Sequence, residues 1–123
     1  MSGLRPTVVA IALLAAQTAL ADTYPVSGTW TYDNATAKGP AKICGPRIMR
    51  FAGDVRHDTE TSAPDYRNMS VKKTSATTWR IDDQFYTVQI WGRVHYTLRV
   101  IDEDHIEIEY DKGGSRLLRR CAS

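Results

Sequence analysis

The residues best suited to catalysis or metal binding are three histidines and the acidic residues near them. His57 lies in the segment 54–60, whose carboxylates could coordinate a divalent ion. Because Arg56 lies inside this segment and its spacing matches no known metal-binding loop, we expect a solvated loop and no metal site. His95 and His105 are expected on the outer face of a sheet. The chain lacks the motifs of serine hydrolases, zinc hydrolases and phosphate-binding loops, which argues against an enzyme.

Trp91 and Arg93 are the strongest candidates for binding another molecule. Trp and Arg are enriched at binding hot spots, and turn chemistry requires neither of them. We expect Trp91 at the tip of a hairpin around Gly92, with Arg93 beside it, as a contact surface for a macromolecular partner. In the alternative, Trp91 folds back as a lid over one end of a barrel. No residue set indicates a cofactor.

The N-terminus has the pattern of a secretory signal peptide. An arginine precedes the apolar run 8–16, and a small-x-small sequence ends at Ala21. The run is shorter than the roughly 20 residues that span a bilayer, so we expect cleavage and no stable membrane insertion. The sequence therefore predicts a signal peptide, 1–21, and a single exported domain, 22–123, in the periplasm or outside the cell.

Export places Cys44 and Cys121 where a disulfide can form and persist. Small exported domains have limited core area, and a bond closing such a long loop stabilises the fold by about 4 kcal/mol in the chain-entropy estimate. The spacing is not that of a metal or redox pair. The net charge is +2 for the full chain. This near-neutral balance gives no electrostatic reason to expect nucleic acid as a partner.

Short runs of alternating apolar residues, separated by turn-forming clusters, predict an all-β fold of about eight antiparallel strands. The polar segment 52–66 is expected to be a loop. A closed barrel is preferred to an open meander or a sandwich, because open edges promote aggregation and the disulfide joins distant parts of the chain. The strands are expected at 28–32, 47–51, 67–73, 77–81, 85–90, 94–101, 105–110 and 115–121.

The parity of the apolar residues predicts how neighbouring strands align. Tyr96 is expected opposite Tyr110, which also makes Arg99 and Glu107 neighbours. A two-residue turn is expected at 83–84.

A three-residue loop at 91–93 would place Val88 opposite Tyr96, and a two-residue turn at 92–93 would place it opposite Thr97. Burial favours the three-residue loop.

The register of the last hairpin stays open. One alternative buries Leu117 and Arg119 together with Cys121, and the disulfide favours it weakly. The other alternative buries Arg116, Leu118 and Arg120.

The sequence Gly28-Thr29-Trp30 resembles the G-x-W motif of the lipocalins and their shorter calycin relatives. The resemblance implies that Trp30 closes one end of the barrel, and that Arg119 or Arg120 lies across its ring. In size and export the chain is similar to the bacterial exported calycin-type inhibitors of metalloproteases, which insert their N-terminal segment into the protease cleft. The two cysteines here are further apart than those of the inhibitors.

These observations predict an exported, non-enzymatic binding protein that contacts a partner protein. A short barrel lined with Trp and Tyr has little room for a large cavity, which favours a protein over a small ligand. Three alternatives remain: an inhibitor of a protease or other secreted hydrolase, a binder of a small apolar ligand, and a small exported hydrolase that uses its histidines and acids.

Overall fold

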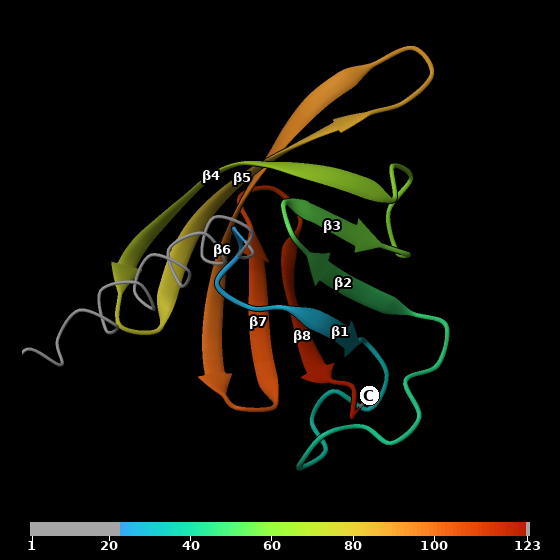
Figure 1. The fold of residues 1–123 in the computed structure, drawn as a ribbon, viewed down its shortest axis with the longest axis vertical. Coiled ribbons are helices and arrows are strands. Elements are labelled where there is room, and N and C mark those ends of the chain that lie inside the picture. The colour runs from blue at the N-terminus through green and yellow to red at the C-terminus, as the bar shows by residue number, and fades with distance from the viewer. Residues whose placement is uncertain (1–22, 123) are drawn as a thin grey trace, which may run out of the picture.

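The computed structural model describes residues 23–122, so the predicted signal peptide lies outside the described residues. Within the described part, the strands form one closed antiparallel barrel, in which each strand pairs with the next and β1 pairs with β8 (Figure 1). The strands are β1 (Gly28–Thr31), β2 (Ile48–Ala52), β3 (Val55–Asp58), β4 (Asp65–Ser75), β5 (Thr78–Tyr86), β6 (Trp91–Asp102), β7 (His105–Tyr110) and β8 (Gly114–Arg120). The predicted all-β barrel is confirmed.

The core is built from alternate positions of the strands, because successive side chains of a strand point to opposite faces. On the first strand, β1, the buried aromatic side chain is that of Trp30. The almost fully buried apolar side chains of the strands are Met49, Phe51, Ile81, Tyr96, Leu98, Ile106, Ile108 and Leu118. Within residues 23–122, no helix has the length and apolar character needed to cross a membrane.

Strand β3 lies inside the segment that was expected to be a solvated loop, so that prediction is wrong for residues 55–58. The strand pairs with β2 on one side and β4 on the other. Its inward-pointing residues, Arg56 and Asp58, are fully buried. A strand with charged inward side chains has no apolar alternation, and a search for that alternation overlooks it.

Strand β5 continues through the position of the predicted turn at 83–84, so that prediction is also wrong. Asp83 is fully buried and points into the barrel, where its carboxylate accepts a hydrogen bond from Arg56. The turn instead covers residues 87–90. As a result Ile81 lies opposite Tyr96, and both registers considered for Val88 are wrong.

The hairpin between β6 and β7 has the predicted register. Tyr96 lies opposite Tyr110, and Arg99 lies opposite Glu107. The side chains of Arg99 and Glu107 form an ion pair.

In the last hairpin, Leu118 lies opposite Ile106 and is fully buried, so the register that the disulfide favoured is wrong. Cys121 follows β8 and forms an isolated bridge with Ala41. Because it lies beyond the strand, its direction does not constrain the alternation along β8.

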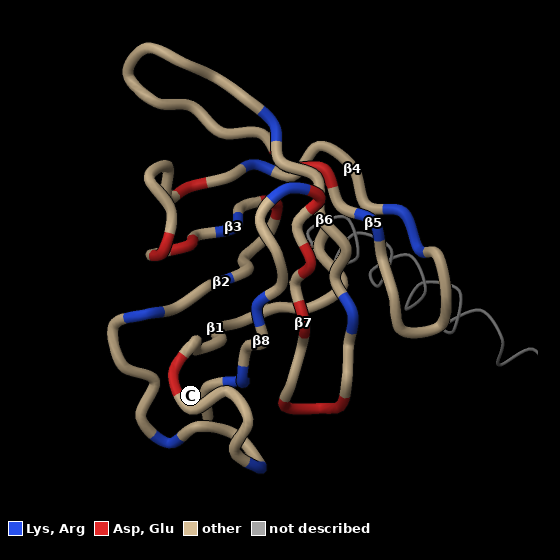
Figure 2. Tube along the Cα trace, turned by 180° about the vertical axis from the view of Figure 1, so that it is seen from behind, with Lys and Arg blue, Asp and Glu red and all other residues tan. Residues whose placement is uncertain are grey.

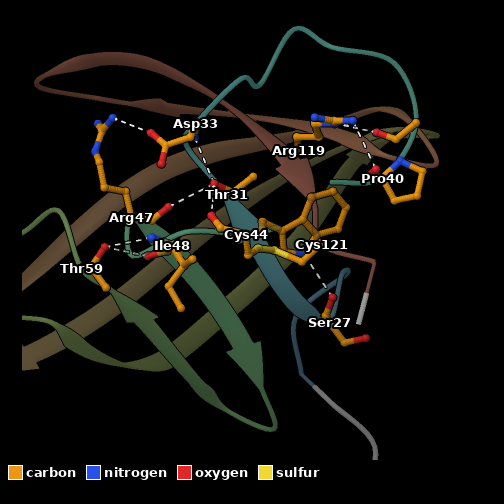
Figure 3. The surroundings of a disulfide bond; sticks show 12 residues. Ser27, Thr31, Asp33, Pro40, Cys44, Arg47, Ile48, Thr59, Arg119 and Cys121 are labelled. Carbon is orange, nitrogen blue, oxygen red and sulfur yellow. Dashed lines mark hydrogen bonds and ion pairs between the residues drawn. A yellow bond between two sulfur atoms is a disulfide. The ribbon is translucent and has the colours of Figure 1, made fainter. Parts of the chain in front are cut away.

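The predicted disulfide between Cys44 and Cys121 is confirmed, with 5.6 Å between the Cα atoms. It attaches the loop between β1 and β2 to the end of β8 (Figure 3). The ladder between β1 and β8 contains only two residue pairs, Trp30 with Arg120 and Thr31 with Arg119. The disulfide therefore reinforces the shortest seam of the barrel, and its presence is compatible with export.

The arginines that the calycin resemblance placed on the Trp30 ring make other contacts. Arg119 donates hydrogen bonds to three loop carbonyls, including that of Pro40 (Figure 3). Arg120 pairs with Asp104 at 2.6 Å. The indole nitrogen of Trp30 donates to the carbonyl of Ser27. The cation–π contacts observed within residues 23–122 involve tyrosines and Trp79.

Candidate functional site

The hairpin between β5 and β6 projects from the barrel (Figure 1). Its last strand pair is Tyr86 with Trp91, and the turn follows at residues 87–90. The backbone nitrogen of Thr87 donates to the carbonyl of Ile90 at 2.7 Å. The backbone nitrogen of Ile90 donates to the Thr87 hydroxyl at 3.1 Å, so the turn is closed twice.

Trp91 lies at the base of the turn, so its predicted position at the tip is wrong. The reason is that β5 is longer than expected and moves the turn to 87–90. Trp91 is 59% exposed, and its ring lies 6.5 Å from the ring of Tyr86. This exposure does not fit a lid over the barrel end.

Arg93 lies two residues after Trp91 on the same strand, so both side chains share the outer face. It is opposite Gln84 and donates to Asp82 at 3.3 Å. The Asp82 side chain is mostly covered, whereas that of Arg93 is 46% exposed. The structure thus places the two predicted binding residues side by side, with the guanidinium held but accessible.

Four large apolar side chains of this hairpin are exposed, and we call them the hairpin patch: Tyr86, Val88, Ile90 and Trp91. Val88 at the turn is 100% exposed. Figure 2 shows the projecting hairpin without charged residues, which appear again at its base. Elsewhere acidic and basic residues are interspersed. Contiguous exposed apolar side chains are typical of interaction surfaces.

At the base of the hairpin, the aromatic ring of Phe85 packs directly against Gly92. A Cβ atom at Gly92 would lie 2.8 Å from Cζ of Phe85, the residue opposite it. The Phe85 ring also makes an edge-on contact with Tyr66, with 5.6 Å between centroids. This packing fixes the hairpin to the barrel and leaves the patch beyond it exposed.

A depression of about 230 Å³ lies beside the hairpin, next to β4 and β5. Tyr86 belongs both to its wall and to the hairpin patch. The volume is below the range of about 300–1,000 Å³ that is usual for sites of small molecules. It suits a single side chain of a partner better than a whole ligand. The lining residues are Val55, Asp65, Tyr66, Arg67, Gln84, Phe85 and Tyr86.

The barrel interior contains a buried charge network that sequence reasoning missed. Arg56 is fully buried; its Nε donates to Asp83 Oδ2 at 2.8 Å, and its Nη1 lies 3.4 Å from Asp58 Oδ2. Its guanidinium lies 4.0 Å from the ring centroid of Tyr66 and 4.8 Å from that of Tyr96. The two carboxylates and one guanidinium thus form the centre of the network.

Tyrosine hydroxyls complete the network around the two carboxylates. Asp83 accepts from Tyr24 at 2.9 Å, from Tyr96 at 2.7 Å and from the side-chain amide of Asn68 at 3.1 Å. Asp58 accepts from Tyr32 at 2.8 Å. Burial, and after it the charge of Asp83, raises the pKa of Tyr24 well above its usual value, so this hydroxyl stays protonated and donates.

The one available signal for this network was that Asp83 shares the parity of the buried Ile81 on β5, whereas the inward residues of β3 are both charged and gave none. Arg56, Asp58 and Asp83 occupy inward positions of β3 and β5. Their charge suggested a loop and a turn, because isolated charges in a barrel interior are costly. Only the pairing of the two strands through β4 brings opposite charges together.

The three histidines lie on different strands, and each contacts an aspartate. Their Nδ1 atoms lie 2.7 Å from Asp65 for His57, 3.6 Å from Asp82 for His95 and 2.7 Å from Asp102 for His105. None of them lines the depression beside the hairpin. Within residues 23–122 no group of three or more His, Cys, Asp or Glu side chains has the geometry of a metal site.

Comparison with protein-family models, with curated proteins and with solved structures found no match for this chain. No family is therefore shown, and the calycin resemblance rests on the barrel and the Gly28-Thr29-Trp30 motif alone.

Proposed function

We propose that this protein is an exported binding protein without enzymatic activity, and that it contacts a partner protein through the hairpin patch and Arg93. The observation that carries the proposal is the projecting, uncharged hairpin with its four exposed apolar side chains. Trp91 and Arg93 belong to residue types that are enriched at the hot spots of protein interfaces. Four exposed apolar side chains do not stabilise the barrel itself, whereas their burial against a partner would stabilise a complex.

A partner protein fits this surface better than a small apolar ligand does. The barrel interior is filled by core side chains and by the network of Arg56, Asp58 and Asp83. The depression beside the hairpin holds about one side chain. A partner with a concave surface could bury the patch and place a side chain in the depression.

Inhibition of a protease or other secreted hydrolase is a narrower form of the same proposal. A convex hairpin is complementary to the cleft of such an enzyme. Tyr24 is buried and donates to Asp83, and the nitrogen of Thr23 donates to Gly53. The start of the described chain is therefore anchored on the barrel, and the hairpin is the segment that would enter the cleft.

Export is supported by the signal-like N-terminus and by the disulfide. N-terminal sequencing of protein isolated from its host should begin at Asp22. An intact Met1 would contradict this part of the proposal.

The function is tested by quantitative binding with matched variants. The mature protein, immobilised, is used to capture partners from an envelope extract, and the captured protein is then purified and titrated. Trp91→Ala should weaken its binding by about 2 kcal/mol, roughly 30-fold. The control is Ile101→Ala, which removes another exposed apolar side chain at the far end of β6.

The control should bind like the wild type, and neither variant should lower the melting temperature by more than a few degrees. Unchanged binding by Trp91→Ala, or an equal loss in both variants, would contradict the proposed contact surface.

A further inference from the structure

Within the described residues, 23–122, part of β6 has no neighbouring strand on one side. Its pairing with β7 extends only to Tyr96 opposite Tyr110, with one further bond from the nitrogen of Asp111 to the carbonyl of His95 at 3.1 Å. Beyond this point β6 continues to Trp91, paired with β5 alone. We call residues 91–94 on the β7 side the free edge.

The alternation of backbone hydrogen bonds determines which groups face the free edge. The nitrogen of Val100 donates to Thr77, and the carbonyl of Ile90 accepts from Thr87, so even-numbered residues bond toward β5. The carbonyl of His95 accepts from the nitrogen of Asp111, which directly follows β7. Odd-numbered residues of β6 therefore bond toward β7. No register shift interrupts the pairing of β5 with β6.

Trp91 and Arg93 have the parity of His95, so their backbone N–H and C=O groups point to the free edge. Within residues 23–122, no hydrogen bond to these four groups is observed. The two residues thus offer a short ladder of backbone donors and acceptors, and their side chains flank it on the outer face. Natural proteins protect such edges unless they are used.

We propose that the free edge binds an extended segment of the partner protein, which adds to the barrel as a strand beside Trp91 and Arg93. This inference rests on the proposed function and specifies how the partner is bound. Main-chain hydrogen bonds supply affinity in this binding mode, and alternate side chains supply specificity. The residue of the segment nearest Trp91 on the outer face should be apolar. Because Asp82 already holds Arg93, no strong preference for an acidic residue is expected there.

An extended segment fits this edge better than a second copy of the chain or a lipid surface. Stable interfaces bury about 1,200–2,000 Å² in total, and two barrels that meet along four residues bury much less. Lipid tails cannot satisfy backbone N–H and C=O groups. A flexible segment can follow the short edge and then cover the hairpin patch.

The test separates the backbone of Arg93 from its side chain. Arg93→Ala removes the guanidinium and keeps the N–H, whereas Arg93→Pro also removes the N–H. Proline is tolerated where the strand nitrogen faces solvent, so Arg93→Pro should keep the fold. Val94→Pro removes a nitrogen that bonds toward β5 and should lower the melting temperature clearly, which checks the assignment of the two edges.

The probe is a peptide selected from a random library on the mature wild-type protein. Its affinity should fall about tenfold more for Arg93→Pro than for Arg93→Ala, the effect of one lost interface hydrogen bond of about 1.4 kcal/mol. Bound peptide should slow amide exchange at Trp91 and Arg93. Exchange at Gly92, whose nitrogen points to β5, should not change.

Equal affinities of Arg93→Pro and Arg93→Ala, unprotected amides at Trp91 and Arg93, a library without binders, or self-association alone would each overturn the inference. If Arg93→Pro does not fold, the amide exchange of the wild type decides. Loss of partner binding in Trp91→Ala without any of the edge effects would leave the proposed function standing and remove only the strand addition.

Discussion

Replacement of Asp83 by asparagine tests the buried charge network directly. Asp83 accepts four hydrogen bonds, from Arg56, Tyr24, Tyr96 and Asn68. Asparagine keeps the size of the side chain but has one acceptor oxygen and an NH2 group in place of the second. Two donors would then face the NH2 group, and Arg56 would lose the shorter of its two ion-pair contacts.

The expected cost follows from burial. Arg56 and Asp83 are both fully buried, so solvent does not screen their interaction. Removal of one partner of a buried ion pair costs about 3–5 kcal/mol, because the remaining charge stays in the interior. A domain of this size has a free energy of unfolding of about 5–15 kcal/mol. The melting temperature should therefore fall by about 15 °C or more.

The assay is urea denaturation followed by tryptophan fluorescence, together with a thermal scan. Asp82→Asn is the matched control, since Asp82 is the adjacent residue of β5 and its two partners, Arg93 and His95, are half-exposed on the outer face. Its loss should be below about 1 kcal/mol. A loss of less than about 1 kcal/mol for Asp83→Asn, or equal losses in the two variants, would refute the stabilising role of the network.

Three further predictions concern other parts of the barrel. Cys121→Ala removes the bond to Cys44 and should lower the free energy of unfolding by up to about 4 kcal/mol, measured by urea denaturation, because the bond closes a loop with a separation of 77 residues; an unchanged midpoint would contradict this. Gly92→Ala should displace the aromatic ring above it and lower the melting temperature by several degrees, and an unchanged melting temperature would show that the ring moves freely. The hydrogen bond to Asp102 raises the pKa of His105, so the stability advantage of the wild type over His105→Gln should be full below pH of about 6.5 and decline as the pH rises through the raised value. A constant difference between the two proteins from pH 5 to about pH 9 would contradict the assignment of that charge.

The sequence by itself determined the class of fold and much of its core. Apolar alternation placed β6 and β7 and their register, with Tyr96 opposite Tyr110, because a shift of one residue would expose every buried side chain. It also indicated the disulfide, since the signal-like N-terminus led us to expect export and two cysteines have only one pairing. Trp91 and Arg93 were predicted as binding residues from residue type alone, and they lie on one exposed face of β6.

Only the tertiary structure decided where the charged residues of β3 and β5 lie. Arg56 is an unfavourable interior residue until the pairing of β3 and β5 through β4 brings Asp83 Oδ2 to within 2.8 Å of its Nε, so no local pattern indicates its burial. The burial of Asp83 carries β5 past 83–84 to Tyr86, so the turn lies at 87–90 and Trp91 and Arg93 lie beyond the end of β7. Local alternation records which face of a strand is apolar, whereas the pairing of distant strands determines which charges meet and which edge stays open.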